Sequence, residues 1–199
     1  MQNVAGNHYD KYSSTNPIER RMMQGFFGAL ARALGDGRPA RVVEIGCGEG
    51  HATAYLRERF PDADIVGLDL PDDRLAEHWR ELGIPMMFGD IHQLPFPDAS
   101  IDLVVALEVL EHVADPARAL DELVRVCRGD AVISVPREPI WRIGNMARGR
   151  YVSALGNTPG HVNHWSARSF RSLLGTRFDV ISLSKPLPWT MARVRPRRG

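Results

Sequence analysis

The 199-residue sequence holds little cysteine: Cys47 and Cys127 are the only two, and they lie far apart in the chain. Such a pair cannot build a disulfide framework, and its spacing does not match a structural zinc site. Chains that are poor in disulfides are typical of reducing compartments, so we expect a cytoplasmic protein.

Long apolar runs are also missing. No stretch approaches 18 uninterrupted apolar residues, and the first residues lack a basic start followed by an apolar core. We therefore expect neither a membrane-spanning helix nor an export signal. The sequence predicts no membrane partner.

There is no excess of charge of either sign. The chain has 25 Lys and Arg against 24 Asp and Glu, for a formal net charge of +1. This balance gives no overall attraction to nucleic acid or membrane, so no nucleic-acid partner is expected. Only residues 192–199 are locally basic, and we expect them to form a frayed, solvated end.

Strand-like and helix-like segments alternate along most of the chain. Five short apolar runs rich in β-branched residues are each followed by a helical pattern or a loop before Pro136. This alternation predicts a doubly wound α/β fold with helices on both faces of a parallel sheet. Residues 178–196 predict two more strands around Pro186 and Pro188, paired antiparallel at the edge. The expected sheet is seven-stranded and mostly parallel, with an antiparallel edge strand.

The stretch VVEIGCGEGHATAYL puts Gly46, Gly48 and Gly50 between a predicted strand and a predicted helix. An interior glycine costs about 0.5 to 1 kcal/mol relative to alanine, so the cluster indicates a tight turn or a backbone lying against a ligand. Ligands of open α/β sheets bind near this first turn. A dinucleotide fingerprint would need glycine in place of His51, and a phosphate loop would need a lysine, which the junction lacks.

Three acidic residues lie at the same edge of the predicted sheet. Glu44 precedes the glycine turn, Asp69 ends the second strand and Asp90 ends the third. A carboxylate about 20 residues after the glycines accepts hydrogen bonds from ribose hydroxyls. The three acids suit a cationic nucleoside better than a phosphate, although Asp69 and Asp90 could instead be ordinary turn or cap residues.

These motifs resemble the class I S-adenosylmethionine-dependent methyltransferases. VVEIGCGEG, GLDL, GDIHQLPFPDASIDLVVALEVLEHV and DPARALDELVRV follow the order and spacing of that family, over roughly Tyr9 to Pro136. The resemblance implies a Rossmann-like fold, S-adenosylmethionine as the cofactor and methyl transfer as the activity.

The resemblance also implies roles for matching residues near the glycine turn. Gly46, Cys47 and Gly48 would pass close to the methionine portion of the cofactor. Asp69 would bind the ribose hydroxyls, and Leu70 would pack beside the adenine. Cys47 is more simply a small space-filling residue than a nucleophile, because no His or Lys adjoins it in sequence.

Further along the chain, the same resemblance implies that Asp90 accepts from the adenine amino group and that the amide of Ile91 meets a ring nitrogen. Leu107 and Glu108 would border the methionine portion. The tyrosines of HYDKY resemble an aromatic lead-in that closes over the cofactor, but simple packing explains them equally well. The expected cofactor-binding residues are Tyr9, Tyr12, Glu44, Gly46, Cys47, Gly48, Asp69, Leu70, Asp90, Ile91, Leu107 and Glu108.

The segment EVLEHV supplies candidate catalytic residues. Methyl transfer from a sulfonium is an in-line displacement, so positioning supplies most of the catalysis, but a hydroxyl acceptor also benefits from a base or a metal. Glu108, Glu111 and His112 stand at i, i+3 and i+4, which predicts that they share one helical face at the mouth of the cofactor pocket. We expect Glu111 and His112 to be catalytic, as a base or as groups that orient the acceptor.

A Glu-x-x-Glu-His segment is similar to one in small-RNA 3′-end 2′-O-methyltransferases, and related signatures occur in ubiquinone-pathway O-methyltransferases. In the RNA enzymes these side chains and a later histidine hold a divalent ion. HVNHWSARSF offers His161 and His164 for that position. A divalent metal at Glu108, Glu111, His112 and His161 is therefore an open alternative.

We expect a single domain with four parts. Residues 1–37 form an N-terminal lid helix, 38–136 the cofactor-binding core, 137–165 an insertion over the acceptor, and 166–199 the final helix and edge strands. The aromatic side chains of the insertion either contact the acceptor or simply roof the sheet.

The resulting hypothesis is methyl transfer to a small-molecule acceptor, with a hydroxyl oxygen favoured. Alternatives are a metal-assisted RNA or nucleotide 2′-O-methyltransferase, a non-catalytic nucleoside-binding module and, as the weakest, a dehydrogenase. The oligomeric state does not follow from the sequence.

Overall fold

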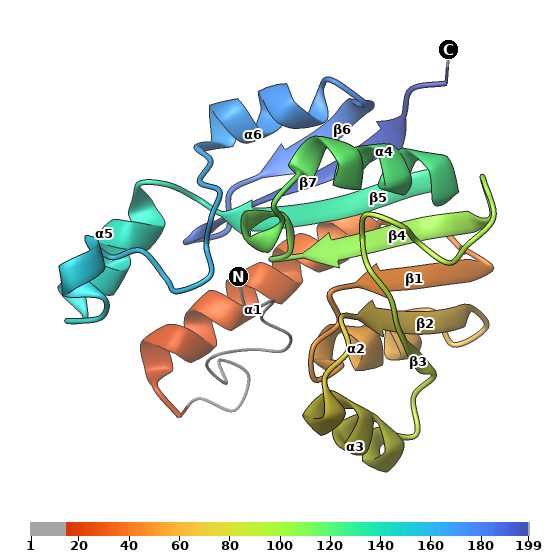
Figure 1. Cartoon of the computed structure of the whole chain (residues 1–199), viewed down its shortest axis with the longest axis horizontal. Coiled ribbons are helices and arrows are strands. Elements are labelled where there is room, and N and C mark those ends of the chain that lie inside the picture. Colours follow the sequence, from red (N-terminus) through yellow and green to blue (C-terminus); the bar gives the residue numbers. More distant parts are fainter. Residues whose placement is uncertain (1–14, 199) are drawn as a thin grey trace.

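The computed structural model describes residues 15–198, which form one seven-stranded sheet with helices on both faces (Figure 1). The strands are β1 (Arg41–Ile45), β2 (Asp64–Asp69), β3 (Met86–Phe88), β4 (Ile101–Leu107), β5 (Cys127–Pro136), β6 (Phe178–Ser184) and β7 (Trp189–Pro196). The helices are α1 (Pro17–Leu34), α2 (His51–Arg59), α3 (Asp73–Leu82), α4 (Pro116–Val126), α5 (Ile140–Ala147) and α6 (Ala167–Leu174), with 3₁₀ turns η1 (Leu110–His112) and η2 (Val152–Ala154).

The strand order is β3-β2-β1-β4-β5-β7-β6. Strands β1 to β5 are parallel to one another, whereas β7 runs antiparallel to both of its neighbours, β5 and β6. The predicted fold class is therefore confirmed, with β6 as the outermost strand of the antiparallel pair. None of the helices in this part of the chain is long and apolar enough to cross a membrane.

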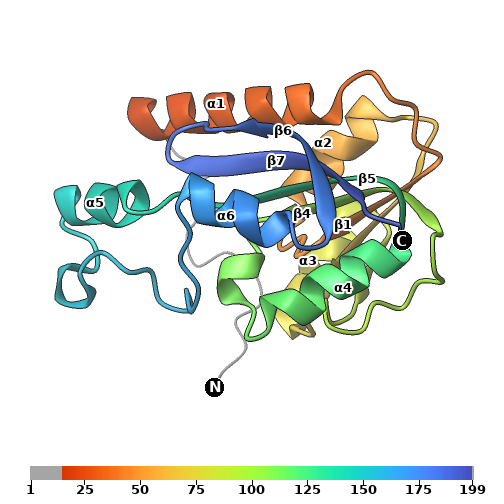
Figure 2. The same ribbon diagram turned by 90° about the horizontal axis from the view of Figure 1, so that it is seen from above.

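Helices α1 and α2 cover one face of the sheet, and α4 and α6 cover the other (Figure 2). Residues of β4 serve both layers: Leu103 and Val105 pack toward α1 and α2, while Val104 and Ala106 pack toward α4 and α6. A strand buried on both faces needs apolar residues at every position, which explains the continuous apolar run in its sequence.

Capping side chains set where two of the helices begin. The side chain of Asn16 accepts a hydrogen bond from the amide of Ile18 at 2.9 Å, with Pro17 in the first turn of α1. Ser166 accepts from the amide of Ser169 at 3.1 Å and begins α6 in the same way. Such caps satisfy amide groups that a helix leaves without partners.

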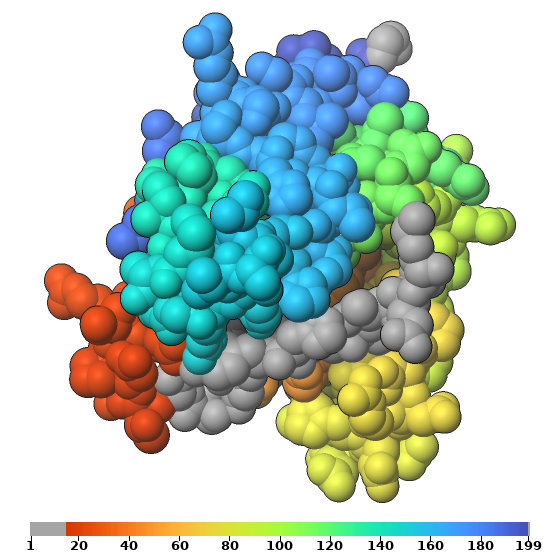
Figure 3. Space-filling view, turned by 60° about the vertical axis from the view of Figure 1, so that its left-hand side comes forward, coloured from red at the N-terminus to blue at the C-terminus, as the bar shows by residue number. Residues whose placement is uncertain are grey.

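The insertion of residues 137–165 leaves the sheet after β5 and returns beside its starting point. Arg137 and Trp165 form a parallel bridge, and the amide of Glu138 donates to the carbonyl of Trp165 at 2.9 Å. Between these ends the segment builds α5 and η2, which project past the carboxyl ends of the strands (Figure 1). In the space-filling view it lies beside the first turns of α1 (Figure 3).

The basic C-terminal segment is not a frayed end, and that expectation was wrong. Ala192 and Val194 are completely buried in β7, so Arg193 and Arg195, which alternate with them, belong to a strand inside the sheet. Arg193 and Arg195 each donate from Nε to a carboxylate oxygen of Asp130 at 2.7 Å. The alternation of small apolar residues with arginine is a strand pattern that the local charge obscured.

Replacing Asp130 by asparagine should lower the free energy of unfolding by about 1 to 3 kcal/mol at neutral pH, because two arginines lose their charged acceptor. Burial alone would raise the pKa of Asp130, but the hydrogen bonds from Arg195 and Arg193 hold it below its ordinary value of 3.8. A lowered carboxyl pKa stabilises the folded state above the ordinary value, and this stabilisation is lost as the pH falls through the folded-state pKa.

Urea unfolding at neutral pH and at about pH 3 would therefore show a large difference between the wild type and Asp130→Asn that narrows in acid. Asp121→Asn is the matched control, because Asp121 pairs with Arg177 on an exposed surface. It should change stability by less than about 0.5 kcal/mol. An equal loss in the two variants would contradict the role of Asp130.

Candidate functional site

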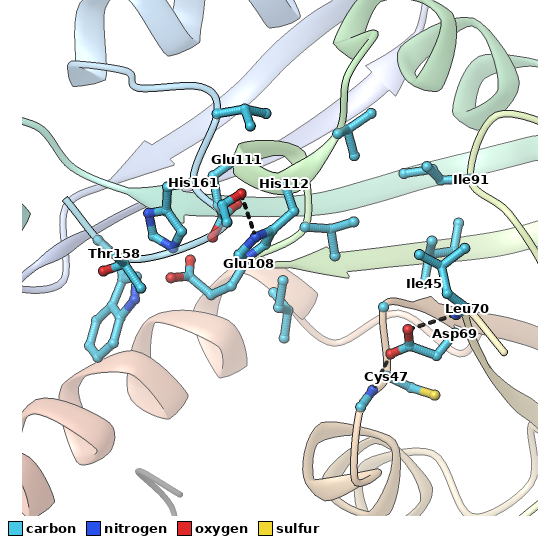
Figure 4. A pocket seen from close by; sticks show the side chains of 18 of the residues that line it. Ile45, Cys47, Asp69, Leu70, Ile91, Glu108, Glu111, His112, Thr158 and His161 are labelled. Atoms are coloured by element: carbon cyan, nitrogen blue, oxygen red, sulfur yellow. Dashed lines mark hydrogen bonds between the residues drawn. The ribbon is translucent and has the colours of Figure 1, made fainter. Parts of the chain in front are cut away.

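A pocket of about 600 Å³ opens at the carboxyl ends of β1, β2 and β4. Of the predicted cofactor-binding residues, those in the described part of the chain line it: Glu44, Gly46, Cys47, Gly48, Asp69, Leu70, Asp90, Ile91, Leu107 and Glu108. The predicted catalytic residues Glu111 and His112 line the same pocket, together with His161 (Figure 4). Tyr9 and Tyr12 lie outside the described residues.

The glycine turn forms one wall of this pocket. Gly46, Gly48 and Gly50 have φ angles of +72°, +50° and +85°, in the left-handed region that favours glycine. The amides of Gly46 and Cys47 both donate to the carbonyl of Leu68, at 2.7 and 3.1 Å. The turn is thus held against the end of β2, and Gly46, Cys47 and Gly48 line the pocket.

Asp69 ends β2 and is buried beside this turn. Its Oδ2 accepts from the amide of Gly48 at 2.6 Å, and its Oδ1 accepts from the amide of Leu70 at 2.7 Å. Burial raises the pKa of Asp69, although these two hydrogen bonds act to lower it. Each carboxylate oxygen has a second acceptor site, so the group is able to bind a pair of hydroxyls from the pocket.

Glu44 lies one residue before the end of β1 and is also buried. The hydroxyl of Thr53, in the first turns of α2, donates to its Oε2. Burial, opposed by the Thr53 hydrogen bond and reinforced by the charge of Asp69, raises the pKa of Glu44 to about 8. Burial also raises the pKa of the Cys47 thiol far above neutral, which agrees with a space-filling residue and not with a nucleophile.

Two further residues, Trp79 and His92, hold groups on the glycine-turn side of the pocket, and the sequence analysis did not predict their contacts. The indole Nε1 of Trp79, on α3, donates to the carbonyl of Gly48 at 2.7 Å. His92 donates its amide to Asp90 Oδ1 at 2.8 Å and holds its ring Nδ1 at the same distance from that oxygen. No spacing rule joins Trp79 to a glycine 31 residues earlier, whereas a polar residue two positions after an Asp is a known turn signal.

Glu108 does not share a helical face with Glu111 and His112, so that part of the prediction was wrong. It has a φ of +61°, and η1 begins only at Leu110. The chain therefore reverses direction between Glu108 and η1. The hydroxyl of Ser134 donates to Glu108 Oε1 at 3.0 Å, which fixes the side chain at the carboxyl ends of β4 and β5.

Glu111, His112 and His161 meet on the other side of the pocket, and we refer to them as the Glu-His-His cluster. One possible ligand atom from each of them lies within 4.8 Å of the other two. The rings of His112 and His161 stand edge to face, with centroids 4.8 Å apart. His164, the other candidate, lies elsewhere, with Nε2 2.6 Å from Oδ1 of Asn157.

Trp141 and Gly160 support the cluster from the insertion. The Trp141 ring stacks on His161 with centroids 5.9 Å apart. The Nδ1 of His112 lies 3.1 Å from the carbonyl oxygen of Gly160. Because a carbonyl only accepts, Nδ1 carries the proton in this bond and Nε2 of the neutral ring is the basic nitrogen.

Asn163 fastens the insertion to the turn that carries the cluster, and sequence reasoning missed it. Its Nδ2 donates to the carbonyls of Leu110 and Val113, at 3.1 and 2.6 Å. The amides of Val162 and Asn163 both donate to the carbonyl of Glu111, at 2.8 and 3.1 Å. The insertion and η1 therefore form one hydrogen-bonded unit.

Asn163→Ala should loosen this unit without unfolding the protein. Losing two side-chain hydrogen bonds at about 1 kcal/mol each predicts roughly 5- to 30-fold faster amide hydrogen exchange in residues 108–115 and 158–165. Asn163→Asp should behave alike, because a carboxylate cannot donate to two carbonyls. Unchanged exchange in both segments would show that Asn163 does not hold them together.

Known proteins are similar to this chain over most of its length. Residues 43–135 match the family model described as a methyltransferase domain. The fatty-acid O-methyltransferase of Mycolicibacterium smegmatis is 34% identical over 175 residues, which are 86% of this chain and 61% of that protein. For eight curated relatives, this one included, the chain spans between 32% and 61% of the relative's length.

Solved structures show the same fold at low sequence identity. The partner of the Trm112 methyltransferase activator of Haloferax volcanii aligns with a TM-score of 0.72 and 19% identity, over 91% of this chain and 92% of that one. The N-methyltransferase NodS of Bradyrhizobium japonicum WM9, solved with S-adenosyl-L-homocysteine, aligns with a TM-score of 0.66 and 22% identity, over 96% and 94% of the two chains.

Proposed function

The chain belongs to the class I S-adenosylmethionine-dependent methyltransferases, and from this premise we propose that it methylates a hydroxyl oxygen of a small-molecule acceptor. The observation that carries the proposal is the Glu-His-His cluster, which shares one pocket with the glycine turn. The name of the relative from Mycolicibacterium smegmatis, a fatty-acid O-methyltransferase, supports an oxygen acceptor and a small molecule.

The cofactor half of the pocket has the chemistry that S-adenosylmethionine requires. Gly46 and Gly48 of the glycine turn line the pocket, and the acidic groups of Asp69 and Asp90 suit a cationic nucleoside. Asp69 would accept the ribose hydroxyls, while Leu70 and Ile91 would flank the adenine. When bound, the cofactor supplies a methyl group on a positively charged sulfur.

The cluster supplies the base that a hydroxyl acceptor needs. The His112 proton sits on Nδ1 beside the Gly160 carbonyl, so Nε2 is the nitrogen that would take a proton from the acceptor. The carboxylate of Glu111, buried next to it, would stabilise the imidazolium that forms. His161 and Trp141 would hold the ring and the acceptor in place.

Calorimetry with S-adenosylmethionine, followed by methyl-transfer assays on a panel of phenols, aliphatic alcohols, carboxylic acids and amines, tests the proposal. We expect cofactor binding and transfer to a hydroxyl compound. Transfer to carboxylic acids alone would refute the hydroxyl acceptor, since an ionised carboxylate needs no base. Cofactor binding without transfer to any of the panel would favour a binding module.

We also infer a cytoplasmic protein, because Cys47 and Cys127 are both free and buried. Reducing conditions preserve such thiols.

A second candidate function is metal-assisted methylation of an RNA or nucleotide 2′-hydroxyl. The two imidazoles and one carboxylate of the cluster are a common ligand set for divalent transition metals, and the Gly160 carbonyl would orient the His112 ring. Titrating the protein with Co²⁺ and recording its visible spectrum tests this alternative directly. A saturable spectrum that His161→Ala abolishes would favour it, and no spectrum would exclude a cobalt site there.

A further inference from the structure

The end of the molecule that carries the insertion exposes an unusual number of large apolar side chains. Of 11 such exposed residues in the described part of the chain, eight belong to the first turn of α1, the insertion or the loop before β7. They are Ile18, Ile140, Ile143, Met146, Val152, Leu155, Val162 and Leu187. We refer to these three segments together as the lid face.

Contacts show that these segments are neighbours. Arg148, just after α5, lies 3.6 Å from the carboxylate of Glu19 in the first turn of α1. The amide of Arg137 donates to the carbonyl of Pro188 at 2.9 Å, which places the loop before β7 beside the base of the insertion. Figure 3 shows the insertion and the beginning of α1 next to each other on one side of the molecule.

The apolar side chains of α5 point away from the protein. Ile140, Ile143 and Met146 are spaced three residues apart, so they lie on one side of the helix, and Ile143 is 56% exposed. Asn145 is buried on the opposite side and donates to the Gly156 carbonyl at 2.9 Å. In the described part of the chain, Ile140, Ile143 and Met146 therefore stay exposed, whereas Trp141 of the same helix packs inward.

The lid face is also basic. Residues 17–22 and 137–165 contain six arginines, at positions 20, 21, 137, 142, 148 and 150, and only two acidic residues, Glu19 and Glu138. Glu19 is buried beside Arg148, and Glu138 is half-buried. The net charge of the whole chain is only +1 because the positive charge of the lid face is offset by a net negative charge on the rest of the chain.

We propose that the lid face binds the surface of an anionic lipid bilayer. Exposed apolar side chains among arginines suit insertion at the level of the lipid headgroups, where the guanidinium groups meet phosphates. The same segment lines the pocket: Arg148, Arg150, Tyr151 and Val162 belong to both. A bound protein therefore turns its pocket toward the lipid.

Sequence reasoning predicted no membrane partner because it used the lack of long apolar runs and the net charge, and neither of them reveals this local distribution. The proposed binding is peripheral and does not require a membrane-spanning helix. It is also independent of methyl transfer, so its test needs neither cofactor nor acceptor.

Co-sedimentation of the full chain with vesicles of phosphatidylcholine, with and without phosphatidylglycerol, tests the proposal. We expect binding to the anionic vesicles that is more than about tenfold tighter than binding to neutral ones and that weakens with salt, since each basic residue near the surface contributes about 1 kcal/mol. Equal binding to both vesicles, or binding to neither, would overturn the proposal.

Paired variants locate the surface. Ile143→Asp combined with Leu155→Asp should abolish vesicle binding, whereas Ile181→Asp, at a 49% exposed position on β6, should leave it intact. Arg20→Gln should weaken binding about fivefold, and Arg57→Gln on α2 should not. Equal losses in the lid and control variants would refute the assignment.

Light scattering at the same protein concentrations addresses self-association. A monomer that binds vesicles supports the lipid surface. A dimer that the Ile143→Asp, Leu155→Asp double variant dissociates would show that a second copy covers the lid face, and the proposal would fail. All of these replacements are at exposed positions, so unfolding temperatures close to that of the wild type are expected.

Discussion

Asp69→Ala will weaken the binding of S-adenosylmethionine by roughly two to four orders of magnitude. The carboxylate is the proposed acceptor for two ribose hydroxyls, and a hydrogen bond to a charged group contributes about 1.5 to 3 kcal/mol. The change also releases the amides of Gly48 and Leu70, which Asp69 holds at 2.6 and 2.7 Å. Isothermal calorimetry at neutral pH measures the affinity directly.

The matched control is Asp64→Ala, because Asp64 begins the same strand β2 and is exposed. Its affinity for the cofactor should equal that of the wild type. Asp69→Asn should lie between the two, since an amide keeps one acceptor oxygen. Wild-type affinity in Asp69→Ala would remove the basis for assigning this pocket to the cofactor.

His112→Ala will lower kcat about 10²- to 10⁴-fold with the acceptor that the panel identifies, because it removes the proposed base. Glu111→Gln should produce a smaller loss, since the base remains but its imidazolium is no longer stabilised by a carboxylate. The dissociation constant for the cofactor should stay the same in both variants. Single-turnover assays with saturating cofactor separate this effect from binding.

His164→Ala is the control for histidine removal, because His164 lies in the same insertion but interacts with Asn157 outside the cluster. It should retain nearly the full rate. If His112→Ala also retained nearly the full rate, the cluster would have no role in catalysis. Parallel losses of rate and cofactor affinity would instead assign His112 to the cofactor half of the pocket.

The cofactor half of the site was predictable because its determinants are local. The glycines, Glu44 and Asp69 each lie at or next to the end of a strand, and parallel strands bring those ends together at one edge. Predicting the strands was therefore enough to predict that these residues surround one pocket. Their roles in cofactor binding remain predictions.

The acceptor half was less predictable because its geometry depends on backbone conformation and distant contacts. A φ of +61° at Glu108 moves this residue off the helical face that the i, i+3, i+4 spacing suggested. Asn163 reaches carbonyls about 50 residues away in sequence, and no periodicity encodes such a contact. The strand at residues 189–196 was predicted, but its arginines also suggested a solvated end, because the sequence does not show that Asp130 pairs with them.

The insertion leaves and re-enters the sheet at adjacent points, where Arg137 and Trp165 pair. A segment whose two ends are held together by the scaffold is replaceable as a unit, since exchanging its middle leaves the strand register unaltered. We therefore expect an exchange of this insertion to change the pocket around the Glu-His-His cluster and to leave the glycine turn and the strands unaltered.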